Sequence, residues 1–418
     1  MNDAPFARTI TLPCGVTLAN RLVKASMSEG IAGHDNRATD RIVTLYRRWS
    51  RSGAGLLLSG NFQVDKGHLE RPLNIVVDET GLDGLAHVAQ AGSANGAQFW
   101  AQLSHTGRLV SSTINSAPLA PSEVELDVPA SLGRSYAKPQ AMTEEQIAHA
   151  IAQFGSAARL VKAAGFTGVH VHGAHGYLIS QFLSGRSNVR SDRWGGTLLN
   201  RARFLLETIA SIRAAVGQRF PIGLKLNSSD FMKGGFTNDD ALEVVGWLND
   251  SGLDLLELSG GSVEQPKSFG ITFKDEGQDA RPESTIKREA YFVDFAAKIR
   301  NVAKMPVMVT GGFRTADAMN HAISAGEVDM IGLARPFCAD PDIAAKLLSG
   351  ESDRAPSLEA TLAPFLVLPW CNVQIERMAD GLEPDLALTG EDAVARFKAL
   401  ETGNLAAWRA RNTAGAGQ

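Results

Sequence analysis

Three histidines and a tyrosine crowd one short stretch of the sequence, GVHVHGAHGYLISQFLSG at residues 168–185. The four residues are His170, His172, His175 and Tyr177. Imidazoles can ligate a metal, hydrogen-bond in a catalytic pocket or pack in a core. His170 and His172 share strand parity, so both can point toward the same face of a strand. The chemistry that applies depends on where the fold places this stretch.

Short apolar runs alternate with longer amphipathic segments along most of the chain. Eight runs have the composition of buried strands, and they begin at residues 21, 55, 97, 167, 221, 253, 306 and 328. The clearest helix follows Thr143, which forms a capping box with Gln146. Eight strand–helix units predict an α/β fold, a TIM (β/α)8 barrel. A doubly wound sheet would need a GxGxxG turn after an early strand, and the early strands lack one.

Three segments lie outside the strand–helix repeat. Residues 9–21 predict a small hairpin at the barrel floor, and residues 104–140 predict a long loop after the third strand. A loop of that length is typical of a lid over a site. We expect the barrel to occupy residues 1–350, with a C-terminal extension at 351–418 packed on or beside it.

Composition narrows the class of partner. The 418 residues carry 41 Lys+Arg and 45 Asp+Glu, a net charge of −4, which gives no reason to expect nucleic acid or an anionic membrane. No apolar run approaches the roughly 20 residues that span a bilayer. The N-terminus lacks the pattern of a signal peptide, and the three cysteines are far apart in sequence. We therefore expect a cytoplasmic protein acting on a small molecule.

A metal-dependent barrel hydrolase is one interpretation of the histidines, because HVH is an HxH pair. Such enzymes usually carry HxH on the first strand and need further ligands from later strands. The later strand ends offer Lys225, Asn227, Glu257 and Ser259, but no histidine. No metal is therefore predicted, and the hydrolase is kept as an alternative.

A long segment, GFTGVHVHGAHGYLISQFLSGRSNVRSDRWGGTLLNRARF, resembles the signature of the Old Yellow Enzyme family of FMN-dependent NADH:flavin oxidoreductases and ene-reductases. Five further motifs agree in order: NRLVKASMSEG, QLSHTGR, STIKREAYFVDFA, PVMVTGGFRT and VDMIGLARPFCADP. The resemblance runs from residue 8 to about residue 348. It implies an FMN-binding barrel, with NADH or NADPH as reductant.

The resemblance also implies a reaction: reduction of activated C=C bonds in enones, enals and similar compounds, by ping-pong hydride transfer from flavin N5. A flavoprotein demethylase or nitroreductase on the same fold is the alternative within this class. A homo-oligomer stays open.

The roles of individual residues follow from the same resemblance. His172 and His175 would bind the substrate carbonyl oxygen as an oxyanion hole, and Tyr177 would donate a proton. No role follows for His170. The flavin would be bound by Ala25, Ser26, Met27, Ser28, Gly60, Gln102 and Lys225, and its phosphate by Gly311, Gly312, Ala334 and Arg335, at the ends of the last two strands.

Overall fold

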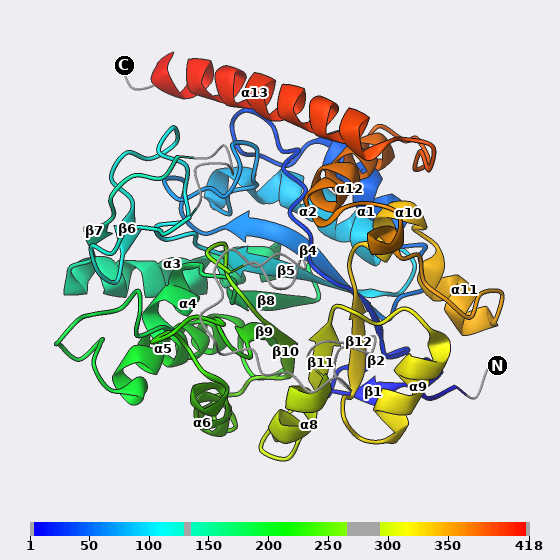
Figure 1. The fold of residues 1–418 in the computed structure, drawn as a ribbon, viewed down its shortest axis with the longest axis horizontal. Helices are drawn as coiled ribbons and strands as arrows, with labels where there is room; N and C mark the ends of the chain where they lie inside the picture. Colours follow the sequence, from blue (N-terminus) through cyan, green and yellow to red (C-terminus); the bar gives the residue numbers. More distant parts are fainter. Residues whose placement is uncertain (1–3, 129–134, 266–292, 415–418) are drawn as a thin grey trace.

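Eight parallel strands close into a barrel with helices around it (Figure 1). The computed structural model describes residues 4–128, 135–265 and 293–414. The strands follow each other around the barrel in chain order. They are β3 (Leu22–Lys24), β4 (Leu56–Gln63), β5 (Gln98–Ser104), β8 (Gly168–Gly173), β9 (Ile222–Asn227), β10 (Leu255–Ser259), β11 (Val307–Thr310) and β12 (Met330–Leu333). Each coincides with one of the eight apolar runs, so the predicted TIM barrel is confirmed.

Helices on the outside of the barrel bury one face against the strands. They are α1 (Asp40–Trp49), α2 (Leu82–Ser93), α3 (Glu144–Ala163), α4 (Leu178–Leu183), α5 (Leu198–Val216), α6 (Asn238–Leu248), α8 (Val293–Arg300), α9 (Ala316–Ser324), α10 (Pro336–Ala339) and α11 (Ile343–Ser349). The predicted capping box is confirmed. The Thr143 side chain accepts a hydrogen bond from the Gln146 N–H, and the Gln146 side chain accepts one from the Thr143 N–H. Side-chain caps also begin α5 at Thr197 and α6 at Thr237, so local sequence fixes where these helices start.

The barrel interior is apolar at its lower level. Inward side chains from six strands form one cluster, made of Val23, Leu56, Leu58, Trp100, Leu255, Met308 and Met330. The antiparallel pair β1 (Ile10–Thr11) and β2 (Thr17–Leu18) adds Ile10, Leu12 and Leu18 to it. The predicted hairpin is therefore present, and it closes the barrel floor with apolar side chains. Because strand side chains alternate, the next inward residues lie one level higher, nearer the carboxyl ends.

The long loop after β5 has little regular structure. Its described part holds only β6 (Leu119–Ala120), which pairs with β7 (Gln140–Ala141), and residues 129–134 lie outside the described residues. The motif STIKREAYFVDFA lies mostly within 266–292, also outside them, so only its end, in α8, is described. Single helical turns occur at η1 (Pro5–Ala7), η2 (Glu79–Gly81) and η5 (Leu358–Ala360).

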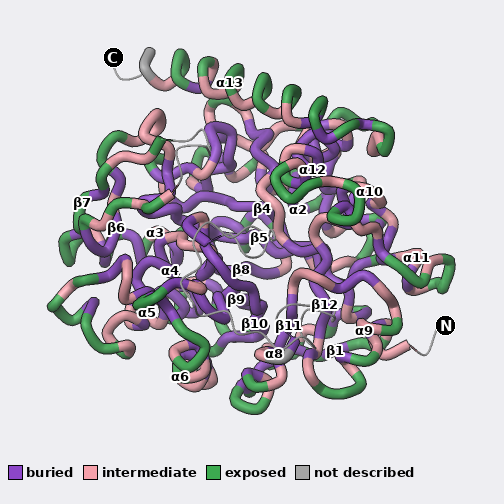
Figure 2. Tube along the Cα trace, viewed as in Figure 1, coloured by how far each residue is buried: buried purple, intermediate pink, exposed green. Residues whose placement is uncertain are grey.

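The C-terminal segment packs against the barrel through α12 (Pro364–Ala379) and α13 (Gly390–Ala414), the latter lying along one edge of the molecule (Figure 1). Arg41 of α1 binds Glu376 at 2.5 Å and Asp380 at 2.6 Å, and Trp408 Nε1 donates to Asn36 Oδ1 at 2.8 Å. Figure 2 shows buried residues along the barrel strands and exposed ones along α13. None of the described helices has the length and apolar character needed to cross a membrane.

Candidate active site

Four neighbouring strands carry a layer of inward polar side chains just above the apolar floor. Gln102 on β5, His170 on β8, Lys225 on β9 and Glu257 on β10 are all at most 4% exposed. The strand register places Gln102 opposite His170 and Lys225 opposite Glu257. Gln102 and Lys225, which were predicted to meet the flavin, are thus brought to one level of the barrel mouth.

His172, His175 and Tyr177 gather above this layer, as predicted. The His172 ring centroid lies 5.1 Å from that of His175 and 4.5 Å from that of Tyr177, with both pairs edge to face. His175 has a left-handed backbone, with φ of 59°, which turns the chain sharply after β8. Tyr177 then stands at the N-cap of α4. The turn explains how residues that are close in sequence come to face one another.

Both histidines above the layer are held neutral. Burial, together with His175 and Lys225, keeps the pKa of His172 well below its usual value. Burial and Lys225 lower the pKa of His175 to about 3. The His172 Nδ1 accepts from the Ala174 N–H at 3.3 Å, which leaves the proton of the neutral ring on Nε2. The His175 Nε2 lies 2.7 Å from Ser259 Oγ, so Ser259 is a contact that sequence reasoning missed.

The segment after β3 forms the next side of the mouth. The Ala25 N–H donates to Leu333 O at 2.8 Å, and Met27 Sδ lies 3.5 Å from Cys338 Sγ. Ser28 Oγ accepts from Asn74 Nδ2 at 3.1 Å, which leaves the Ser28 hydroxyl proton free to donate elsewhere.

Ser26 and Gly60, two other predicted flavin contacts, differ in whether they already make a hydrogen bond within the protein. Ser26 Oγ is buried and has no hydrogen-bond partner among the described residues. The Gly60 N–H, by contrast, donates to Glu29 Oε1 at 2.8 Å, and that carboxylate also accepts from Tyr46. Gly60 therefore lies at the mouth with its N–H already engaged, whereas the Ser26 hydroxyl can accept a ligand.

The predicted phosphate residues come together at the ends of β11 and β12. Gly311 and Gly312 have φ of 111° and 89°, a region that side chains rarely adopt, and a Cβ on Gly311 would meet nothing within 4 Å. Arg335 Nη1 lies 2.5 Å from Glu359 Oε1, and Arg314 Nη2 lies 2.9 Å from the same oxygen. Two guanidinium groups thus converge on one anionic oxygen, which is the donor set that a phosphate needs.

These observations fit FMN at both of its ends. The glycine turn and paired arginines suit the phosphate, and the unpartnered Ser26 hydroxyl, with Gln102 and Lys225, suits the polar flavin edge. Arg314 and Glu359 were not predicted. Arg314 lies two residues after Gly312 and could have been suspected, but Glu359 lies in the C-terminal segment, beyond the resemblance.

The loop after β5 is fastened across the mouth by Arg108. Arg108 Nη1 donates to Val124 O at 2.7 Å and to Glu125 O at 2.9 Å, and Nη2 lies 2.7 Å from Glu264 Oε2. Both charged side chains are at most 6% exposed. Because Glu264 follows β10, this pair joins the loop after β5 to a segment three strands further around the barrel.

One group of side chains has the spacing of metal ligands among the described residues: Asp65, His68 and His105. Its ligand atoms are already engaged. His68 Nδ1 bonds Asp65 Oδ1 at 2.8 Å, and His68 Nε2 accepts from the Leu119 N–H at 3.0 Å. His170, His172 and His175 form no such group there. The hydrolase alternative, which needed those three histidines, gains no support.

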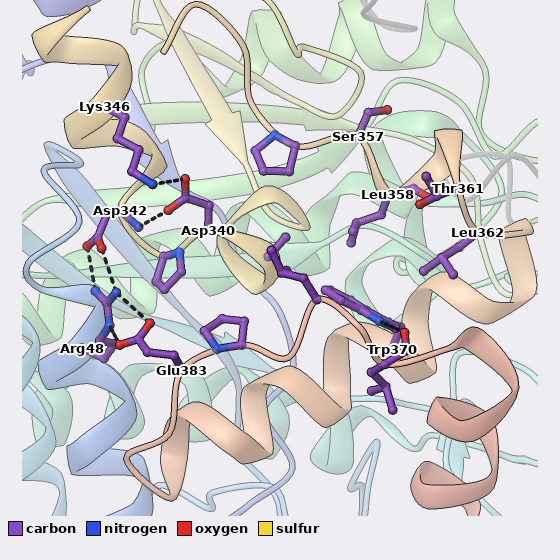
Figure 3. Close-up of a pocket in the computed structure, with 16 residues that line it drawn as sticks. Arg48, Asp340, Asp342, Lys346, Ser357, Leu358, Thr361, Leu362, Trp370 and Glu383 are labelled. Atoms are coloured by element: carbon purple, nitrogen blue, oxygen red, sulfur yellow. Dashed lines mark hydrogen bonds and ion pairs between the residues drawn. The ribbon is translucent and has the colours of Figure 1, made fainter. Parts of the chain in front are cut away.

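One cleft of the structure lies away from these residues. It measures about 670 Å³ and runs between α1, α11 and the C-terminal segment (Figure 3). Its charged side chains pair with one another: Arg48 binds Asp342 at 2.7 Å and Glu383 at 3.1 Å. The cleft is therefore a seam between the barrel and its extension, without the groups of the candidate site.

Comparison with known proteins identifies the family of the chain. The profile of the NADH:flavin oxidoreductase / NADH oxidase family matches residues 10–354. An NADH-dependent flavin oxidoreductase, nadA, of Aspergillus parasiticus is 34% identical, over 92% of this chain and 87% of its own length. Another, iliE of a Neonectria species, is 37% identical over 82% of this chain, which spans only 46% of that protein.

A solved structure shows the same fold. The Old Yellow Enzyme homologue from Zymomonas mobilis superimposes with a TM-score of 0.70 at 24% identity, over 85% of this chain and 95% of that one. The chain therefore belongs to the NADH:flavin oxidoreductase / NADH oxidase family, which confirms the predicted Old Yellow Enzyme membership, the class of NAD(P)H-dependent flavin oxidoreductase, and FMN as its cofactor.

Proposed function

We propose that the protein reduces activated C=C bonds in small molecules such as enones and enals, using NADH or NADPH in a ping-pong cycle. The observation that supports this most directly is the edge-to-face contact of Tyr177 with a neutral His172 whose Nε2 bears the ring proton. A hydrogen-bond donor and a phenol then lie side by side at the barrel mouth. Polarising a carbonyl and protonating the adjacent carbon require that pair of groups.

Each residue has one task in this proposal. FMN, when bound, would supply the hydride chemistry that links the nicotinamide to the substrate β-carbon. His172 donates its Nε2–H to the substrate carbonyl oxygen, and His175 supplies the second donor, its ring turned by the contact with Ser259. Tyr177 protonates the α-carbon. Lys225 places a positive charge at the flavin edge. Its ammonium group is a single point charge, unlike the planar guanidinium group of an arginine.

The proposal assigns the cofactor contacts as the resemblance did. Ala25, Ser26, Met27, Ser28, Gly60 and Gln102 line the flavin, and Gly311, Gly312, Ala334 and Arg335 bind the phosphate. Arg314 is added to the phosphate set because it binds the same carboxylate as Arg335.

The organisation of the whole chain is also a proposal. We infer an FMN-binding unit at residues 1–350, followed by an extension that packs on α1. We also place the enzyme in the cytoplasm, because its three cysteines form no disulfide bond. A homo-oligomer stays an open part of the proposal, and light scattering measures it.

One anaerobic spectrum tests the reaction. The FMN-loaded enzyme is titrated with NADPH or NADH and then with cyclohexenone, with cyclohexanone as the matched control that lacks the C=C bond. We expect the flavin bands to bleach with the nicotinamide and to return with cyclohexenone only. Bands that bleach but do not return would redirect the search to another acceptor, such as a nitro compound. Failure to bind FMN would refute the site.

A further inference from the structure

A continuous chain of polar side chains crosses the barrel below the proposed flavin site, and it includes the histidine that had no role. Glu70 Oε2 accepts from Asn61 Nδ2 at 2.6 Å, and Asn61 Oδ1 accepts from Gln102 Nε2 at 2.6 Å. Gln102 Oε1 lies 3.1 Å from His170 Nδ1. Asn61, Gln102 and His170 occupy paired positions on β4, β5 and β8, so the strand register itself aligns these links.

The other end of the chain is formed by Glu257. Its Oε2 lies 3.2 Å from His170 Nε2, and its Oε1 lies 3.2 Å from Lys225 Nζ. The His170 imidazole can reach β10 because Gly223 stands between them on β9. A Cβ on Gly223 would lie 2.5 Å from His170 Cδ2 and 3.0 Å from a ring carbon of Trp100. The absence of a side chain at Gly223 therefore allows the His170 ring to extend past β9 toward β10.

The direction of the hydrogen bonds fixes one proton on His170. The Glu70 carboxylate only accepts, which orients the Asn61 amide and, through it, the Gln102 amide. Gln102 then presents its oxygen to His170, so Nδ1 must be the donor.

A neutral ring protonated at Nδ1 would point a bare lone pair at a carboxylate. His170 and Glu257 are both 0% exposed. Among the described residues, His170 Nε2 and Glu257 Oε2 make no hydrogen bond, and Glu257 Oε1 has only the ion pair with Lys225 Nζ at 3.2 Å. Two acceptors facing each other in such a place would leave both without a hydrogen bond, at a cost of about 1–3 kcal/mol for each. One further proton between Nε2 and Oε2 removes that conflict, whichever of the two atoms carries it.

We propose that His170 and Glu257 share one buried proton, and that this electrically neutral pair acts as a positioning device for the flavin site. It fixes the amide of Gln102, and it leaves the charge of Lys225 uncompensated, available to the flavin edge. This inference rests on the proposed function for the roles of Gln102 and Lys225, but the shared proton does not.

The proton is tested directly by nitrogen NMR of the histidine-labelled holoenzyme, with the His170 signals assigned by their loss in His170→Asn. We expect Nδ1 of His170 to carry a proton throughout mildly acidic to mildly alkaline pH. A neutral ring protonated only at Nε2 would overturn the proposal, because Glu257 would then need no proton. This readout stands even if the proposed reaction proves wrong.

The consequence for the cofactor is tested with Glu257→Gln. An amide there donates to His170 Nε2 and accepts from Lys225, as a protonated carboxyl does, so the ratio of the Kd values for oxidised and reduced FMN should change by less than about threefold. If Glu257 were instead a bare carboxylate neutralising Lys225, its removal would favour reduced FMN by about tenfold or more.

Two variants keep this test interpretable. In Glu257→Leu, a side chain of similar size removes the contacts of Glu257 with His170 Nε2 and with Lys225 Nζ. We therefore expect this variant to bind both forms of FMN more weakly. Equal FMN binding by the Gln and Leu variants would refute the pair. Asp254→Asn is the matched control, a buried carboxylate just before the same strand that binds Arg213 at 2.7 Å near the floor. It should leave the Kd ratio unchanged.

Discussion

The two ends of the barrel interior differ in their side chains, which are apolar at the floor and polar or charged at the mouth. At the floor, side chains such as Leu18, Trp100 and Met308 are completely buried in one apolar cluster. At the mouth, Lys225, Glu257, His170 and His172 are buried almost as deeply. Burying a large apolar side chain stabilises the fold by about 1.5–3 kcal/mol, whereas a buried charge costs several kcal/mol before its partners offset that. The comparison indicates that the floor stabilises the fold, whereas the mouth holds the groups that we propose carry the chemistry.

The largest expected effect breaks the chemistry at the mouth and leaves stability alone. Tyr177→Phe should slow reoxidation of the reduced flavin by cyclohexenone by about 10²- to 10⁴-fold, because the proton donor is lost. Flavin reduction by NADPH should stay unchanged. Stopped-flow measurement of the two half-reactions decides this, with Tyr136→Phe in the lid loop as control. An equal loss in both half-reactions would show that Tyr177 is not the proton donor.

The next effect breaks the floor and leaves the chemistry alone. Leu18→Ala should lower the free energy of unfolding by about 2–5 kcal/mol, because it opens a cavity in a fully buried cluster. Urea denaturation measures this, and Thr17→Ala, at the exposed neighbouring position, is the control. If Leu18→Ala instead changed the half-reactions and left stability unaltered, the assignment of the floor to stability would fail.

A smaller effect is expected on FMN binding, at the part of the mouth that we propose binds the phosphate. Arg335→Lys should weaken FMN binding by about 1.5–3 kcal/mol, roughly 10- to 150-fold, because a lysine cannot donate as a fork. Fluorescence titration of the apoprotein with FMN gives the Kd, and the exposed Arg354→Lys serves as control. An unchanged Kd would move the phosphate site away from β12.

The smallest effect per residue comes from pH and also belongs to the mouth. Burial depresses the pKa of His105, His172 and His175, so at these three residues the folded protein binds fewer protons than the unfolded chain below the ordinary histidine pKa of about 6.5. Stability should therefore be full above that pH and fall on acidification, toward about 3 for His175. From neutral pH to about 5.5, we expect a loss of about 1 kcal/mol per histidine.

Thermal unfolding at the two pH values measures that loss. His105→Asn should flatten the dependence, whereas His34→Asn, at a residue that is not buried, should leave it as steep as in the parent protein. A stability that rose on acidification would contradict the neutral histidines.

Particular residues show how far the sequence could lead. The apolar runs located all eight strands, and Thr143 with Gln146 located a helix start, because periodicity and capping are local properties. The shared parity of His170 and His172 correctly suggested that both point inward. The resemblance supplied Tyr177 and the phosphate arginine. Ser259, Glu359 and the role of Glu257 were missed, since each acts through a residue 24 or more positions away in the sequence.

What the sequence determined by itself was the class of fold, the family and the residue types at the strand ends. What only the tertiary structure decided was the pairing of those residues across strands. The partner of His170 depended on the barrel register and on the space left by Gly223, and neither is a property of the segment that contains His170. The physical reason is that hydrogen bonds and ion pairs act over about 3 Å, so they are settled only once the closed barrel brings distant segments together.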